Sequence, residues 1–117
     1  DAAIVRICTW GKFKDKLSKQ TFYFFNTHFD HIGEQARTES AKLIVQKIQQ
    51  IAGANAPVVL TGDFNADPQS AAYQAITSYL QDTHNISQIP PFGPEGTFNG
   101  FDYQAPLDRR IDYVFVK

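Results

Sequence analysis

A carboxylate and an amide stand two residues apart at the end of an apolar run. The run Val58-Val59-Leu60-Thr61-Gly62 leads directly into Asp63, and Asn65 follows. Alternate residues of a strand share a face, so we expect Asp63 and Asn65 to point the same way from its carboxyl end. A carboxylate can position or deprotonate a water or bind a hard cation, and an amide can orient a water or a phosphoryl oxygen. The same Gly-Asp-x-Asn sequence is equally suited to a simple turn.

A second apolar run ends in an imidazole. Residues 21 to 25 are followed by Asn26, Thr27 and His28. In open α/β sheets ligands lie at the carboxyl ends of the strands, so two such ends side by side would form a site. A lone histidine at a strand end is more often an ordinary polar group. Because the strand end at His28 would lie next to the one that carries Asp63, a functional role for His28 is favoured, as a donor to an anionic oxygen.

A third carboxylate interrupts the last apolar run. Asp112 lies in a predicted strand over residues 110–116, with Ile111, Tyr113 and Phe115 on the opposite face. A carboxylate within such a strand costs several kcal/mol unless it is paired. Arg110, two residues earlier on the same face, is the ordinary partner, and a histidine would be the catalytic one.

Strands and helices that would position these residues can be predicted from periodicity. A strand over residues 3–10 and a lysine-rich hairpin tip precede the strand at residues 22–25, which is apolar on both faces. Apolar residues at helical spacing predict a helix over about residues 34–51, ended by Gly53. After the strand at 58–60, Asp67 as N-cap and Pro68 as first helical residue predict a helix to about residue 80. Residues 82–106 form a long loop, and loops of that length are commonly functional.

Composition limits the class of protein. The 117 residues are 43% hydrophobic with a net charge of -1, so we expect one domain with a real core and no bulk attraction to a polyanion. The single cysteine, Cys8, excludes an internal disulfide and a cysteine metal cluster, and is expected to be a small buried hydrophobe. No run approaches the roughly 18 apolar residues of a membrane span. We expect a soluble protein and leave its compartment open.

Three motifs in series carry a family resemblance: Asn26-Thr27-His28-Phe29-Asp30, Gly62-Asp63-Phe64-Asn65 and Arg110-Ile111-Asp112-Tyr113. Together they closely resemble the endonuclease/exonuclease/phosphatase superfamily of metal-dependent phosphoesterases. The resemblance implies an α/β fold that is part of a four-layer sandwich, in which two mixed β-sheets pack face to face with helices outside. Residues 1–117 would then be a single partial domain, roughly the carboxyl-terminal half, short of the final strand.

Roles follow from the resemblance residue by residue. Asp63 would activate or position the attacking water, and Asn65 would orient the water and the phosphate. His28 would donate to a phosphoryl oxygen, and Asp112 would hold a catalytic histidine. Asp63 and Asn65 are also possible ligands of Mg²⁺ or Mn²⁺. The metal-binding glutamate and the final histidine would lie outside this chain. The expected substrate-binding residues are Asn26, Thr97, Phe98 and Asn99.

The leading functional hypothesis is a metal-dependent hydrolase of phosphomonoesters or phosphodiesters, in which water attacks phosphorus. Its partner would be a phosphoester, either a small molecule or a nucleic acid, and nothing in the sequence indicates a protein partner. The alternative is a non-catalytic binding or interaction module on the same fold. The four residues at positions 28, 63, 65 and 112 favour the enzyme, because a binding module has no need of them together. The isolated 117-residue chain is expected to be inactive and poorly stable.

Overall fold

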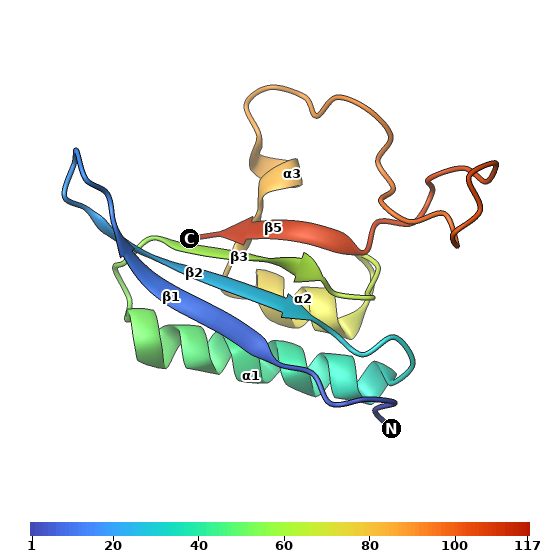
Figure 1. Cartoon of the computed structure of the whole chain (residues 1–117), viewed down its shortest axis with the longest axis horizontal. Helices are drawn as coiled ribbons and strands as arrows, with labels where there is room; N and C mark the ends of the chain where they lie inside the picture. The colour runs from blue at the N-terminus through green and yellow to red at the C-terminus, as the bar shows by residue number, and fades with distance from the viewer.

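The computed structural model describes residues 1–117 and contains one five-stranded mixed sheet with the order β1-β2-β3-β5-β4 (Figure 1). Strands β2 and β3 are parallel neighbours, and the other strand pairs are antiparallel. Their bounds are β1 Cys8–Lys14, β2 Thr21–His28, β3 Val58–Asp63, β4 Gln81–Asp82 and β5 Asp112–Val116. The mixed α/β fold class predicted from the sequence is confirmed.

Two of the three helices cover one face of this sheet, where α1 (Glu34–Ala52) and α2 (Ala71–Thr77) lie side by side (Figure 1). The short α3 (Thr83–Ile86) follows β4. Helix α1 forms because its apolar residues recur at helical spacing, and Ala41, Ile44 and Ile48 are the buried members of that stripe. They pack with inward residues of the strands, such as Phe25 and Leu60. Each large apolar side chain buried in this way contributes about 1.5–3 kcal/mol.

Neither α1 nor α2 covers the opposite face of the sheet, and only the short α3 lies near it, beside β5 (Figure 1). The side chains of this face include several large apolar groups, and Phe13, Phe24 and Val114 are 49%, 37% and 43% exposed. Phe13 stacks on Phe22 of the neighbouring strand, with 5.4 Å between ring centroids. We call this surface the open face. A second sheet packed on it, as the four-layer arrangement requires, stays a prediction.

Three predicted boundaries were wrong. The long loop begins after residue 86 rather than at residue 82, because residues 81–82 form β4 and residues 83–86 form α3, in which the Asp82 carboxylate caps the helix by accepting from the His84 N–H. The first strand begins at Cys8 rather than at residue 3, because the backbone of residues 3 and 4 is hydrogen-bonded to the Asp30 carboxylate instead of to a strand. The second helix begins at Ala71 rather than at Pro68, since Ser70 is the cap and its hydroxyl accepts a hydrogen bond from the Tyr73 N–H. Asp67 instead begins a turn, in which its carbonyl oxygen accepts from the Ser70 N–H.

None of the helices is long and apolar enough to cross a membrane.

Candidate active site

A row of three polar side chains crosses the open face at the carboxyl ends of β2 and β3. His28 is the register partner of Asp63, and Asp63 is the register partner of Asp112 on β5. Directly opposed residues of neighbouring strands share a face, so all three side chains project from the same side of the sheet. Nε2 of His28 lies 3.4 Å from Oδ2 of Asp63. The structure therefore brings together the strand ends that the sequence predicted to meet.

Local hydrogen bonds orient the Asp63 carboxylate. Its Oδ1 atom accepts from the Asn65 backbone N–H at 2.9 Å, which leaves Oδ2 facing His28. Strand β3 ends at Asp63, and Asn65 has a positive φ of 47°, a conformation that asparagine tolerates better than most residues. The Asn65 Nδ2 donates to the Phe29 carbonyl oxygen at 3.1 Å. Asn65 is thus placed by a turn, and strand alternation does not set its direction.

Close approach of β2 and β3 depends on Gly62. A Cβ atom at this position would lie 1.9 Å from the carbonyl oxygen of Thr27, its register partner. Only glycine lets the two backbones meet so closely one residue before His28 and Asp63. The glycine of the Gly-Asp-x-Asn motif is therefore required by the pairing of the two strands.

The start of β5 is held by a buried ion pair. Arg110 and Asp82 are 2.8 Å apart, and their side chains are 8% and 2% exposed. The Tyr73 hydroxyl also donates to Asp82, at 2.9 Å. Of the two alternatives for Asp112, the ordinary one is wrong: Arg110 does not pair with it, because β5 begins only at Asp112 and strand alternation does not extend back to Arg110. Asp112 is exposed on the open face and has no ion-pair partner.

A hollow of about 460 Å³ lies beside this row. His28, Asp63 and Asn65 line it, as do residues that the sequence did not single out. These further residues are Arg6, His31, Phe101, Arg109 and Ile111, and the predicted Phe98 also lines the hollow. Arg6 is distant in sequence from the motifs and Arg109 directly precedes the third one, and only the folded chain shows that both line the same hollow. The hollow has four basic side chains and one carboxylate, so its chemistry suits an anion.

The aromatic pair of the hollow comes from the long loop. Phe98 and Phe101 meet edge to face with ring centroids 5.3 Å apart, and Phe101 is 95% exposed. The Arg109 guanidinium lies 5.8 Å from the Phe98 ring centroid and pairs with Asp67 at 3.2 Å. An exposed aromatic face next to polar groups is suited to stacking on a planar or sugar-like group.

The other three predicted substrate-binding residues lie outside the hollow. Asn26 precedes His28 by two residues on the open face of β2, and its Nδ2 donates to the Thr61 hydroxyl at 2.8 Å. The Thr97 hydroxyl accepts from the backbone N–H groups of Ile111 and Asp112, which helps to position the start of β5. Asn99 accepts from the Phe101 N–H and so orders the aromatic loop.

Asp63 and Asp112 are the carboxylates of this site that could hold a metal ion. No three histidine, cysteine or acidic side chains gather closely enough to form a complete cation site. Asp63 and Asp112 are nevertheless directly opposed on one face, an arrangement of like charges that is unfavourable unless a cation or proton lies nearby. Mg²⁺ is commonly held by one or two carboxylates together with substrate phosphate oxygens. Asp63 and Asp112 therefore fit the role of the protein carboxylates in such a site, with other ligands supplied by the substrate phosphate.

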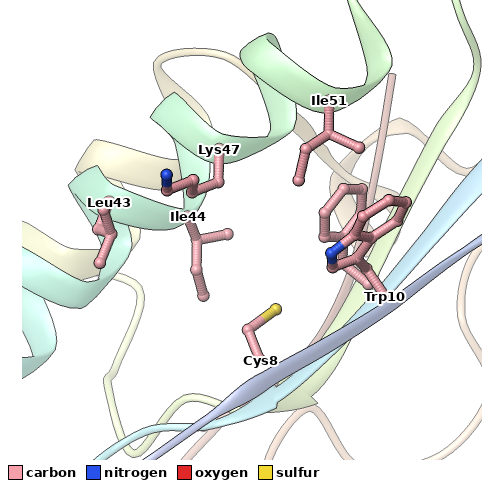
Figure 2. Close-up of a pocket in the computed structure, with 7 residues that line it drawn as sticks. Cys8, Trp10, Leu43, Ile44, Lys47 and Ile51 are labelled. Atoms are coloured by element: carbon pink, nitrogen blue, oxygen red, sulfur yellow. The ribbon is translucent and has the colours of Figure 1, made fainter.

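A separate hollow of about 200 Å³ lies on the helix side, between α1 and the edge of β1 and β2 (Figure 2). The Cys8 thiol, Trp10, Ile44 and Ile51 point into it, and Lys47 lies on the helix above (Figure 2). Burial raises the pKa of the Cys8 thiol, so this half-buried cysteine behaves as a small hydrophobe. An apolar lining offers little to a phosphate, so the polar row on the open face is the better candidate site.

The mixed sheet, with helices α1 and α2 on one face and an imidazole and carboxylates at one end of the other, defines an α/β protein. The profile of the endonuclease/exonuclease/phosphatase family matches residues 4–117, and the chain belongs to this family. The comparison with curated protein sequences finds no match.

Solved structures of this family are closely similar. An endonuclease/exonuclease/phosphatase family protein from Bacteroides thetaiotaomicron is 43% identical with a TM-score of 0.92, and the match covers 100% of this chain and 43% of that one. A mannosyl-6-phosphatase from the same organism is 43% identical with a TM-score of 0.91, covering 100% and 45%. The human nocturnin catalytic domain, at 24% identity and TM-score 0.74 over 95% and 41%, shares the fold. The chain spans less than half of the length of these structures.

Proposed function

We propose that the protein containing this chain hydrolyses phosphoesters by attack of water on phosphorus. The observation that carries the proposal is the row His28–Asp63–Asp112 at one end of the open face, with 3.4 Å between His28 and Asp63. An imidazole N–H and a carboxylate this close can serve one phosphoryl group, one as a donor to oxygen and the other as an acceptor for the proton of water.

Each residue of the site has a distinct task in this reaction. The Asp63 carboxylate holds the attacking water and takes its proton, and its orientation is kept by the Asn65 N–H. His28 donates to a phosphoryl oxygen and stabilises the charge that grows there in the transition state. Asn65 uses its side-chain oxygen, which has no partner among the hydrogen bonds of the chain, to orient water or phosphate. Asp112 positions a histidine that we expect from elsewhere in the protein.

Mg²⁺ or Mn²⁺ is the proposed cofactor, with Asp63 as one ligand and Asn65 as a possible second, alongside a glutamate outside this chain. When bound, it supplies positive charge that offsets the phosphate charge. The isolated 117 residues would then lack part of the donor set, and we expect them to be inactive alone.

A phosphorylated sugar is the first substrate class to test. The mannosyl-6-phosphatase supports this choice because it is 43% identical over the whole of this chain. The exposed Phe101 beside the basic hollow is consistent with stacking on a sugar ring. Relatives at 24% identity or below share only the fold and do not bear on the substrate.

The test is hydrolysis by the whole protein of p-nitrophenyl phosphate, mannose 6-phosphate and bis-p-nitrophenyl phosphate, with Mg²⁺ or Mn²⁺ and then with excess EDTA. We expect turnover that is lost in EDTA and restored by adding back the metal. Activity that persists unchanged in EDTA would contradict the metal-assisted mechanism. No turnover of any ester under any metal condition would favour the binding-module alternative.

A further inference from the structure

Arg6 is an arginine that no carboxylate in the chain neutralises. It takes part in none of the four ion pairs and none of the side-chain hydrogen bonds, and its Nε is buried without a partner. Leaving a buried polar group of a charged side chain unsatisfied costs free energy, more than for a neutral group. The positive charge of the Arg6 guanidinium is therefore not offset by any carboxylate of the chain.

The backbone on both sides of Arg6 is anchored to the end of β2. The Asp30 carboxylate accepts from the N–H groups of Ala3 and Ile4 at 3.0 and 3.1 Å, and the Thr27 hydroxyl donates to the Ile7 carbonyl oxygen at 3.0 Å. Arg6 is therefore held beside His28 although it precedes β1 and lies outside every motif of the site.

Arg6 and Arg109 line the same hollow as His28 and Asp63 but differ in their partners. Arg109 is paired with Asp67 at 3.2 Å, so part of its charge is already offset. Arg6 has no such pair, and it is the arginine of the hollow that is free to bind an anion. Its planar fork of N–H donors matches two oxygens of one phosphate group.

We propose that Arg6 binds the phosphate of the substrate and selects phosphomonoesters over phosphodiesters, an inference that rests on the function proposed above. A monoester carries about -1.5 to -2 charges at neutral pH and three terminal oxygens, as a phosphorylated side chain does. A diester carries one charge and two terminal oxygens. Once His28 has bound one of these oxygens, only one terminal oxygen is left unshared for the two-pronged guanidinium of Arg6, so the contact with a diester is weaker. A cation without a carboxylate partner next to the reacting group therefore favours the monoester.

The test compares R6Q and R6K in the whole protein with the wild type, on p-nitrophenyl phosphate and bis-p-nitrophenyl phosphate. We expect R6Q to lower kcat/KM for the monoester by roughly 10- to 100-fold, because a charge-assisted hydrogen bond contributes about that much. The diester rate should change by less than about threefold. R6K keeps the positive charge but loses the planar pair of N–H donors, so its kcat/KM for the monoester should lie between those of the wild type and R6Q. Lys16→Gln, which removes a charge at the exposed hairpin turn, is the matched control and should change neither rate.

Binding of inorganic phosphate by calorimetry is the second measurement, and it requires no turnover. R6Q should raise the Kd for phosphate by at least about tenfold. R109Q should raise it less, because Asp67 already offsets the charge of Arg109. An equal loss for both esters, an equal loss in R6Q and R109Q, or an unchanged phosphate Kd in folded R6Q would overturn the proposal. If the wild type hydrolyses neither ester, the proposed function fails, and the phosphate Kd still decides the role of Arg6. Circular dichroism checks that each variant is folded.

Discussion

Nε2 of His28 lies 3.4 Å from Oδ2 of Asp63, at the carboxyl ends of two parallel strands that are direct neighbours in the sheet. Residues 29–62 separate them in sequence and include α1 and most of β3, so the contact exists only because β2 and β3 pair in register. Substitutions at Asp63 test the proposed proton transfer, and substitutions at Gly62 test the pairing of β2 with β3.

Replacing Asp63 by asparagine should remove the proton acceptor while keeping the shape of the side chain. We expect Asp63→Asn in the whole protein to lower kcat by about 10²- to 10⁴-fold, the usual contribution of a general base or water-positioning group. The melting temperature should change little, because Asp63 is partly exposed and its Oδ1 contact can be made by an amide oxygen. Asp108→Asn, at an exposed carboxylate, is the control. A near-normal rate for Asp63→Asn would refute its proposed role.

Gly62→Ala should force the ends of β2 and β3 apart, since the new Cβ would lie 1.9 Å from the Thr27 carbonyl oxygen. We expect a loss of about 2–4 kcal/mol in the free energy of unfolding, in the upper part of the range for single substitutions. Activity should fall as well, because His28 moves away from Asp63.

Gly53→Ala is the matched control for this substitution. Gly53 also has a positive φ, of 72°, but nothing lies within 4 Å of its added Cβ. We therefore expect only the backbone penalty of about 1–2 kcal/mol and normal activity. Equal effects of the two substitutions in urea denaturation would show that the close approach at Thr27 has no role.

Removing one member of the buried Arg110–Asp82 pair should leave an uncompensated charge in the core. We expect Asp82→Ala to cost about 3–5 kcal/mol of stability, as is usual for a broken buried pair. Glu39→Ala, which breaks the exposed pair with Lys42, should cost less than about 1 kcal/mol. Chemical denaturation of both variants measures the difference. A similar, small change in each would mean that the buried pair contributes nothing.

Asp30 should make stability depend on acid. The Gly33 N–H donates to its carboxylate at 2.6 Å, and this hydrogen bond, with those from Ala3, Ile4 and Ile32, holds the pKa of Asp30 well below its usual range. A carboxyl with a lowered folded pKa stabilises the protein above its unfolded pKa of about 4, and that contribution is lost as the pH falls further.

Asp30→Asn should therefore melt at a lower temperature than the wild type at neutral pH, and the difference should shrink as the pH falls below about 4. Melting followed by circular dichroism across this range measures it. A difference that stays constant down to about pH 2 would show that the Asp30 charge is not linked to folding.

Local patterns in the sequence were sufficient for most of the elements. Apolar spacing predicted α1, and runs of apolar and β-branched residues predicted β2, β3 and β5, because burial of one or both faces imposes these periods. The motifs also predicted that His28 and Asp63 would meet, since parallel neighbours place their carboxyl ends together. Boundaries set by competing hydrogen bonds, such as the start of α2 at Ala71, could not be derived from propensity alone.

Only the tertiary structure decided which distant residues share the site. Arg6 and Arg109 reach the hollow beside His28 through the anchoring of residues 3–7 and the pairing of the long loop with Arg109, contacts that leave no local pattern. The partner of Arg110 is likewise Asp82, 28 residues away, rather than the neighbouring Asp112. Periodicity records which face of an element is buried, whereas the pairing of charges depends on which elements pack together in three dimensions.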